Sequence, residues 1–144
     1  MKNIKSFKLF EKKVSAKELS LLYTSEILPE IKDIFLPLED SGTDYMINEY
    51  VGDTHEISIY IAQSVYDEIN WLEIKDSIFH LNSYLTEMGW GGFNLTFQKC
   101  SDGDADLGYH APLYEFEEGD LDELDILADI RIRDVVIRFS RWVN

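Results

Sequence analysis

The stretch that decides the fold is Tyr45-Met46-Ile47-Asn48-Glu49-Tyr50-Val51, then Gly52-Asp53-Thr54, then Glu56-Ile57-Ser58-Ile59-Tyr60-Ile61-Ala62. In the second run Ile57, Ile59 and Ile61 alternate with Ser58 and Tyr60, which is the period of a strand buried on one face. A short polar connection between two extended runs is typical of a β-hairpin. We therefore expect an antiparallel sheet at the centre of the fold.

A helical pattern precedes this hairpin. Ser15 and Glu18 have the spacing of a capping box. The apolar residues that follow recur at steps of three and four: Leu19, Leu22, Tyr23, Ile27, Ile31, Ile34, Phe35 and Leu38. The ring of Pro29 would clash with the carbonyl of Ser25, so we expect a kink or two helices end to end. Asp40-Ser41-Gly42 is expected to end the segment.

A second helix is predicted after the hairpin, with its cap at Asn70 and its end at Gly89. Its apolar stripe is expected to contain Leu72, Ile74, Ile78, Leu81, Leu85 and Met88. His80 lies beside this stripe and is expected to be half-buried. Trp90, between Gly89 and Gly91-Gly92, is interpreted as a turn residue with an exposed or docking indole.

Two more strands complete the pattern. Phe93, Leu95 and Phe97 alternate with polar residues, and a last extended run covers 130–139, with a bulge expected near Asp134. The order is helix, strand, strand, helix, strand, strand. We predict an α+β fold with two layers, a mainly antiparallel sheet of about four strands with both helices on one face. The 144 residues are expected to form one domain, 1–144.

Charge is the most unusual property of the chain. Thirteen lysines and arginines stand against 28 aspartates and glutamates, a formal net charge of −15. This excess argues against direct binding to nucleic-acid phosphates. The basic residues gather in an N-terminal segment, 1–14, and in the last fifteen residues, whereas residues 101–129 carry eleven carboxylates and no lysine or arginine.

We interpret residues 101–128 as an acidic connection and a candidate partner-binding surface. Aromatic residues interleave with its carboxylates, and aromatic anchors in an acidic patch suit a partner with a basic surface. The alternative is that these rings fold inward and fix a long loop. The candidate partner-binding residues are Asp102, Asp104, Asp106, Tyr109, Tyr114, Glu115, Glu117, Glu118, Asp120, Asp122, Glu123 and Asp125.

Evidence for a metal or a catalytic group is weak in this sequence. Asp102, Asp104 and Asp106 resemble the start of a calcium loop, but Leu107 and Leu113 occupy the places of its glycine and its bidentate glutamate. A solvated acidic turn is the simpler interpretation, and no other cofactor is expected. His55, His80 and His110 lie far apart in the sequence and in no known catalytic motif. The single cysteine, Cys100, excludes an internal disulfide and favours a reducing cytoplasm.

The first eleven residues, Met1-Lys2-Asn3-Ile4-Lys5-Ser6-Phe7-Lys8-Leu9-Phe10-Glu11, resemble the short basic leaders of internal head proteins of large tailed phages. Those leaders end in an aliphatic residue, any residue and Glu, which Leu9-Phe10-Glu11 matches. The wider sequence is similar to small uncharacterised phage proteins. The resemblance implies a phage origin and, if the leader is used, packaging in the head. The alternative is a first strand or helical turn that docks on the core.

Three functional hypotheses follow. The first is a non-catalytic acidic protein-binding module, such as a phage-encoded inhibitor that masks a basic, nucleic-acid-binding surface of a host or defence protein. The second is a virion or assembly component recruited through residues 1–11. The third is a small-ligand or metal-dependent protein. No apolar run approaches the ~20 residues that span a bilayer, so no membrane partner is expected, and the oligomeric state stays open.

Overall fold

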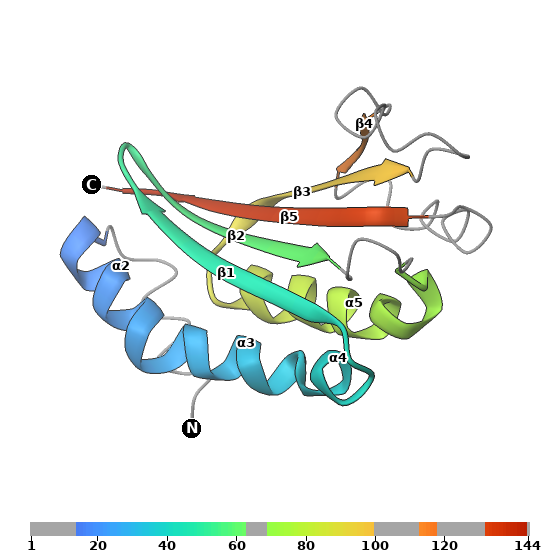
Figure 1. The fold of residues 1–144 in the computed structure, drawn as a ribbon. Helices are drawn as coiled ribbons and strands as arrows, with labels where there is room; N and C mark the ends of the chain where they lie inside the picture. The colour runs from blue at the N-terminus through green and yellow to red at the C-terminus, as the bar shows by residue number, and fades with distance from the viewer. Residues whose placement is uncertain (1–13, 63–68, 100–112, 118–131, 144) are drawn as a thin grey trace.

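Within the part of the chain that the structure describes, five strands form one antiparallel sheet, and the helices lie on one of its faces (Figure 1). The computed structural model describes residues 14–62, 69–99, 113–117 and 132–143. The helical elements are α2 (Ala16–Leu22), η1 (Tyr23–Ile27), α3 (Leu28–Ile34), α4 (Leu36–Asp40) and α5 (Trp71–Glu87). The strands are β1 (Asp44–Val51), β2 (Thr54–Ala62), β3 (Gly91–Lys99), β4 (Leu113–Glu117) and β5 (Ile132–Trp142), in the sheet order β1-β2-β5-β3-β4. The α+β class and the single helical layer were predicted correctly.

The first helical segment is interrupted before Pro29, as expected. The Ser15 hydroxyl accepts a hydrogen bond from the Glu18 amide, which starts α2. One wide turn, η1, then precedes α3, in which Pro29 occupies the first turn. The Leu28 amide donates to the carbonyl of Tyr23, five residues back. Because Pro29 has no N–H and its ring needs space, the wider turn accommodates it where a regular helix would not.

The predicted hairpin is present as β1 and β2. Its register pairs Ile47 with Ile59 and Tyr45 with Ile61. Ile57, Ile59 and Ile61 are fully buried, so this face of β2 packs on the helices. β1 lies outside β2 and is largely exposed along its length.

The apolar stripe of α5 begins one residue earlier than predicted. Trp71 is 1% exposed and Leu72 is 64% exposed, so the prediction for Leu72 was wrong. Trp71, Ile74, Ile78, Leu81 and Leu85 follow steps of three and four, whereas Leu72 is turned about 100° away from Trp71. The same rotation makes His80 exposed, and not half-buried as expected.

Trp90 is fully buried, which contradicts the expectation of an exposed or docking indole. Gly89 has φ 103°, a conformation that glycine adopts without a steric penalty. This residue reverses the chain, and the Trp90 amide donates to the Leu85 carbonyl at 2.8 Å. Because the chain reverses here, the Trp90 indole lies in the core.

The C-terminal strand, β5, is central because β2 and β3 both pair with it. The bulge expected near Asp134 is present: Gln98 pairs with Asp134 and Lys99 with Ile132, which leaves Arg133 as the extra residue.

The predicted acidic connection 101–128 contains a fifth strand that was not expected. β4 pairs with β3 at the edge of the sheet. Its Leu-Tyr-Glu-Phe-Glu alternation is only five residues long and lies within the acidic run, which hides it in the sequence. Pairing with a long neighbouring strand is what forms it, since so short a strand has little stability alone.

Candidate functional site

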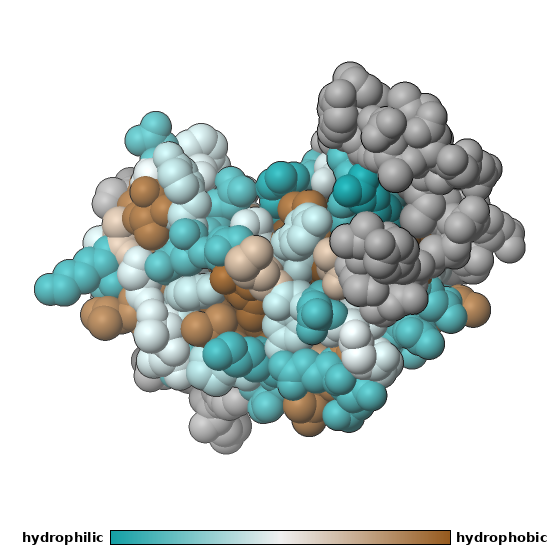
Figure 2. Space-filling view, viewed as in Figure 1, coloured by the Kyte–Doolittle hydropathy of each residue, from teal (hydrophilic) through white to brown (hydrophobic). Residues whose placement is uncertain are grey.

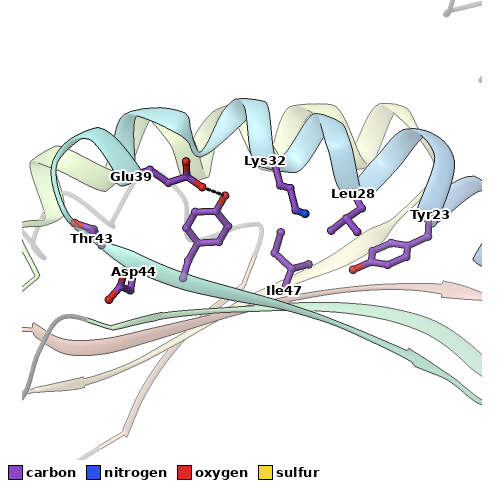
Figure 3. A pocket seen from close by; sticks show the side chains of 8 residues that line it. Tyr23, Leu28, Lys32, Glu39, Thr43, Asp44 and Ile47 are labelled. Atoms are coloured by element: carbon purple, nitrogen blue, oxygen red, sulfur yellow. Dashed lines mark hydrogen bonds between the residues drawn. The ribbon is translucent and has the colours of Figure 1, made fainter.

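A groove lies between β1 and the first helical segment. It has a volume of about 440 Å³, and Figure 3 shows side chains entering it from both sides. Its lining is mixed, with tyrosine, aliphatic and charged residues: Tyr23, Leu28, Lys32, Glu39, Thr43, Asp44, Tyr45 and Ile47. Figure 2 shows a small hydrophobic area in this region, surrounded by hydrophilic residues.

β1 forms one wall of the groove, and the first helical segment forms the other. Tyr45 and Ile47 pair with buried residues of β2 and therefore point toward the helical layer, yet both are only half-buried. Leu28 and Lys32 are four residues apart and share one face of the helical segment. The two elements thus face each other, and the space between them stays open as the groove.

Charge in the groove is dominated by two carboxylates and one ammonium group. The Tyr45 hydroxyl donates to Glu39 Oε1 at 2.9 Å, which Figure 3 marks. Burial and the neighbouring Glu39 carboxylate raise the pKa of Tyr45 to about 12, so its hydroxyl stays protonated at neutral pH. Asp44 and Lys32 are exposed at the rim. The groove therefore offers carboxylate acceptors to a ligand that carries donors or positive charge.

Tyr23, at one end of the groove, contacts a buried histidine. The ring centroids of Tyr23 and His55 are 5.8 Å apart, and His55 is fully buried. His55 Nε2 lies 2.6 Å from Glu49 Oε2, and the Trp90 indole N–H donates to His55 Nδ1 at 3.1 Å. Burial, with a smaller contribution from Glu49, raises the pKa of Tyr23.

These contacts assign the donor and acceptor roles of the two imidazole nitrogens. An indole N–H can only donate, so Nδ1 must accept and carries no proton. The Nε2–H then donates to the Glu49 carboxylate. Both ring nitrogens are used within the fold. Despite the short histidine–carboxylate distance, this pair leaves no ring nitrogen to a substrate, and its role is to join β1, β2 and the turn after α5.

Arg141 extends the same cluster to β5. Its Nη1 donates to the Met88 carbonyl at 3.1 Å, and its guanidinium lies 5.4 Å from the centre of the Trp90 ring. Burial lowers the pKa of Arg141. We name the set Glu49, His55, Trp90 and Arg141 the histidine cluster.

Sequence reasoning missed this cluster because its members come from four separate segments. One signal was present: His55 has the same parity as Ile57, Ile59 and Ile61. Continuing that alternation by one step would have placed His55 on the buried face.

The sheet face opposite the helices carries several large exposed side chains. Met46, Tyr50, Tyr60 and Trp142 are 56%, 67%, 38% and 79% exposed. Met46 pairs with Tyr60, and Trp142 pairs with Thr54. Trp142 is thus a highly exposed aromatic side chain, whereas Trp71 and Trp90 are buried.

Most of the predicted partner-binding residues lie outside the described residues. This group contains Asp102, Asp104, Asp106, Tyr109, Glu118, Asp120, Asp122, Glu123 and Asp125. Tyr114, Glu115 and Glu117 lie on β4, where their backbones pair with Phe97, Thr96 and Asn94. The calcium-loop prediction also falls outside. Within the described ranges, no three His, Cys, Asp or Glu side chains gather closely enough to hold a metal ion.

Comparisons with protein-family models, curated proteins and solved structures find no match to this chain. In the part of the chain that the structure describes, no helix combines the length and apolar character that a bilayer crossing requires.

Proposed function

We propose that this protein is a non-catalytic protein-binding module whose partner presents a basic surface. The observation that carries the proposal is the charge of −15, with eleven carboxylates and no cation between residues 101 and 129. A protein with a large excess of one charge attracts an oppositely charged partner over about 8 Å at physiological ionic strength. This attraction speeds the association of the two proteins. Nucleic-acid-handling proteins carry such basic surfaces, so masking one of them is the mode of action that we propose.

Two features of the described residues support a binding role. Tyr50, Tyr60 and Trp142 are exposed, and large aromatic side chains contribute strongly to binding energy at protein interfaces. His55, in contrast, has both ring nitrogens occupied by Glu49 and Trp90, so this histidine serves the fold.

The test is capture of host proteins from a lysate by the immobilised protein, followed by measurement of affinity for the purified partner. Replacing Asp120, Asp122, Glu123 and Asp125 by lysine should weaken binding by about tenfold or more and remove its salt dependence. The matched control replaces Asp33, Asp53, Asp76 and Glu87, four exposed carboxylates elsewhere, and changes the net charge equally.

Normal binding by the control and lost binding by the first variant would support the proposal. Unchanged capture by the first variant would contradict it. Equal loss in both would show that only total charge matters, and the acidic connection would then have no special role.

A further inference from the structure

Among the described strands, β1 lies at one edge of the sheet. It pairs with β2 over eight residues in an unbroken register from Asp44 to Val51. In an antiparallel pair only alternate residues direct their N–H and C=O groups to the partner strand, so the other half point outward. Between residues 45 and 51, no backbone hydrogen bond to another described segment uses these outward groups.

This edge lacks the usual protection against pairing. It contains no proline or lysine and no bulge, which are common ways to block the edge of a sheet. Its charged side chains are Asp44, at its first residue, and Glu49, whose carboxylate points inward to His55. A regular, exposed edge of eight residues is long enough to pair with an incoming extended segment.

The groove lies directly beside this edge. Tyr45 and Ile47 face it from β1, and Leu28 and Lys32 face it from the helical side (Figure 3). In strand addition, backbone hydrogen bonds supply affinity, while alternate side chains of the added segment enter pockets. The volume of about 440 Å³ gives those side chains a place to enter.

The negative charge of the groove and of the whole protein determines which kind of segment can pair with β1. Two carboxylates, Glu39 and Asp44, and one ammonium group, Lys32, line the groove, so its charged lining residues are net negative. A second copy of the chain would bring two proteins of net charge −15 together and would place Asp44 and Glu49 of each copy beside the same acidic edge. An extended segment that carries lysine or arginine meets no such repulsion.

We propose that β1 is a docking edge to which a lysine- or arginine-containing extended segment of the partner adds as a further strand, with alternate side chains in the groove. This inference rests on the proposed function, because it specifies how a basic partner is held. It adds a backbone-directed contact to the attraction of opposite charges.

The test uses the full chain and an acetylated, fluorescein-labelled octapeptide of alternating valine and lysine, measured by fluorescence anisotropy at 150 mM salt. Two matched peptides carry N-methyl groups on the valine amides or on the lysine amides, which removes alternate donors without changing the charge. One of the two should bind at least tenfold more weakly, and the other should bind about as well as the parent, because its methyl groups face away from β1. Bound parent peptide should also slow hydrogen exchange of amides between residues 45 and 51.

Protein variants give a second readout. Asp44→Lys should weaken binding of the parent peptide several-fold, whereas Glu87→Lys, the same charge change at the far end of α5, should leave it within twofold. Both residues are exposed, so neither change disturbs the core.

Equal binding of all three peptides would overturn strand addition and leave charge-driven binding, the proposed function, intact. Absence of peptide binding by a protein that still captures its lysate partner would also overturn it. Sedimentation of the free protein as a dimer, with the β1 amides already protected, would assign the edge to a second copy and reject the peptide.

Discussion

At the residue scale, His55 shows how one polar side chain is held inside an apolar core. The indole N–H of Trp90 on one side and the Glu49 carboxylate on the other satisfy both ring nitrogens. A buried polar group without a partner costs about 1–3 kcal/mol, whereas a paired one is tolerated. The histidine cluster therefore stabilises the packing of the hairpin, the turn after α5 and the end of β5 against one another.

Replacing His55 should destabilise the protein without removing a catalytic group. His55→Ala leaves the Trp90 N–H unpaired inside the core and opens a small cavity, so we expect a loss of about 2–4 kcal/mol in the free energy of unfolding. Urea denaturation followed by tryptophan fluorescence measures it. Glu49→Gln is the control, because an amide oxygen still accepts from Nε2, and it should cost only about 1 kcal/mol. A loss below 0.5 kcal/mol for His55→Ala would show that the cluster is not structural.

At the scale of elements, helix ends are set by local side chains, whereas strand β4 is set by its neighbour. Ser15 and Asn70 accept hydrogen bonds from the first-turn amides of α2 and α5. Such signals lie within three residues and can be recognised in the sequence. β4 forms by pairing with β3, and that pairing partner is not encoded nearby.

Asn70→Ala should shorten or weaken α5. Its Oδ1 accepts from the Leu72 amide at 3.1 Å, and its loss should reduce stability by about 1 kcal/mol. Asn70→Asp is the matched variant: it keeps the acceptor and adds a negative charge at the helix N-terminus, so it should be neutral or slightly stabilising. Thermal unfolding monitored by circular dichroism compares the two. A larger loss for Asp than for Ala would contradict the assignment of Asn70 as the cap.

At the scale of the whole molecule, the charge of −15 opposes compaction. One ion pair that offsets it joins two described residues: Arg138 lies 3.8 Å from Glu56, and both are partly exposed. Exposed pairs of this kind contribute about 0–1 kcal/mol. Arg141 binds the Met88 carbonyl and lies over the Trp90 ring.

Salt should therefore stabilise the free protein. Raising sodium chloride from roughly 10 mM to 0.5 M shortens the screening length from about 30 Å to a few ångströms, which weakens repulsion among the carboxylates. We expect the Tm to rise by several degrees. Potassium chloride should act equally, because screening depends on ionic strength. An unchanged or lower Tm would show that the carboxylates are already compensated.

Several parts of the candidate site were beyond prediction from the sequence. The groove is formed jointly by residues of β1 and of the first helical segment, and neither segment alone states how closely the two pack. The contact of Tyr23 with His55 joins residues from separate elements. The predicted acidic surface lies mostly outside the described residues, so it stays a prediction, as does the phage origin.

The sequence by itself determined the α+β class, the helix caps at Ser15 and Asn70, the interruption at Pro29 and the buried face of the hairpin. These features depend on hydrogen bonds within one turn and on apolar periodicity, and both act over only a few residues. Only the tertiary structure decided that β5 lies at the centre, that β4 joins the sheet, that Trp90 is buried against His55, and that β1 keeps a free edge beside a groove. These outcomes depend on which distant segments pair and pack, and that is settled by burial of the whole apolar surface at once.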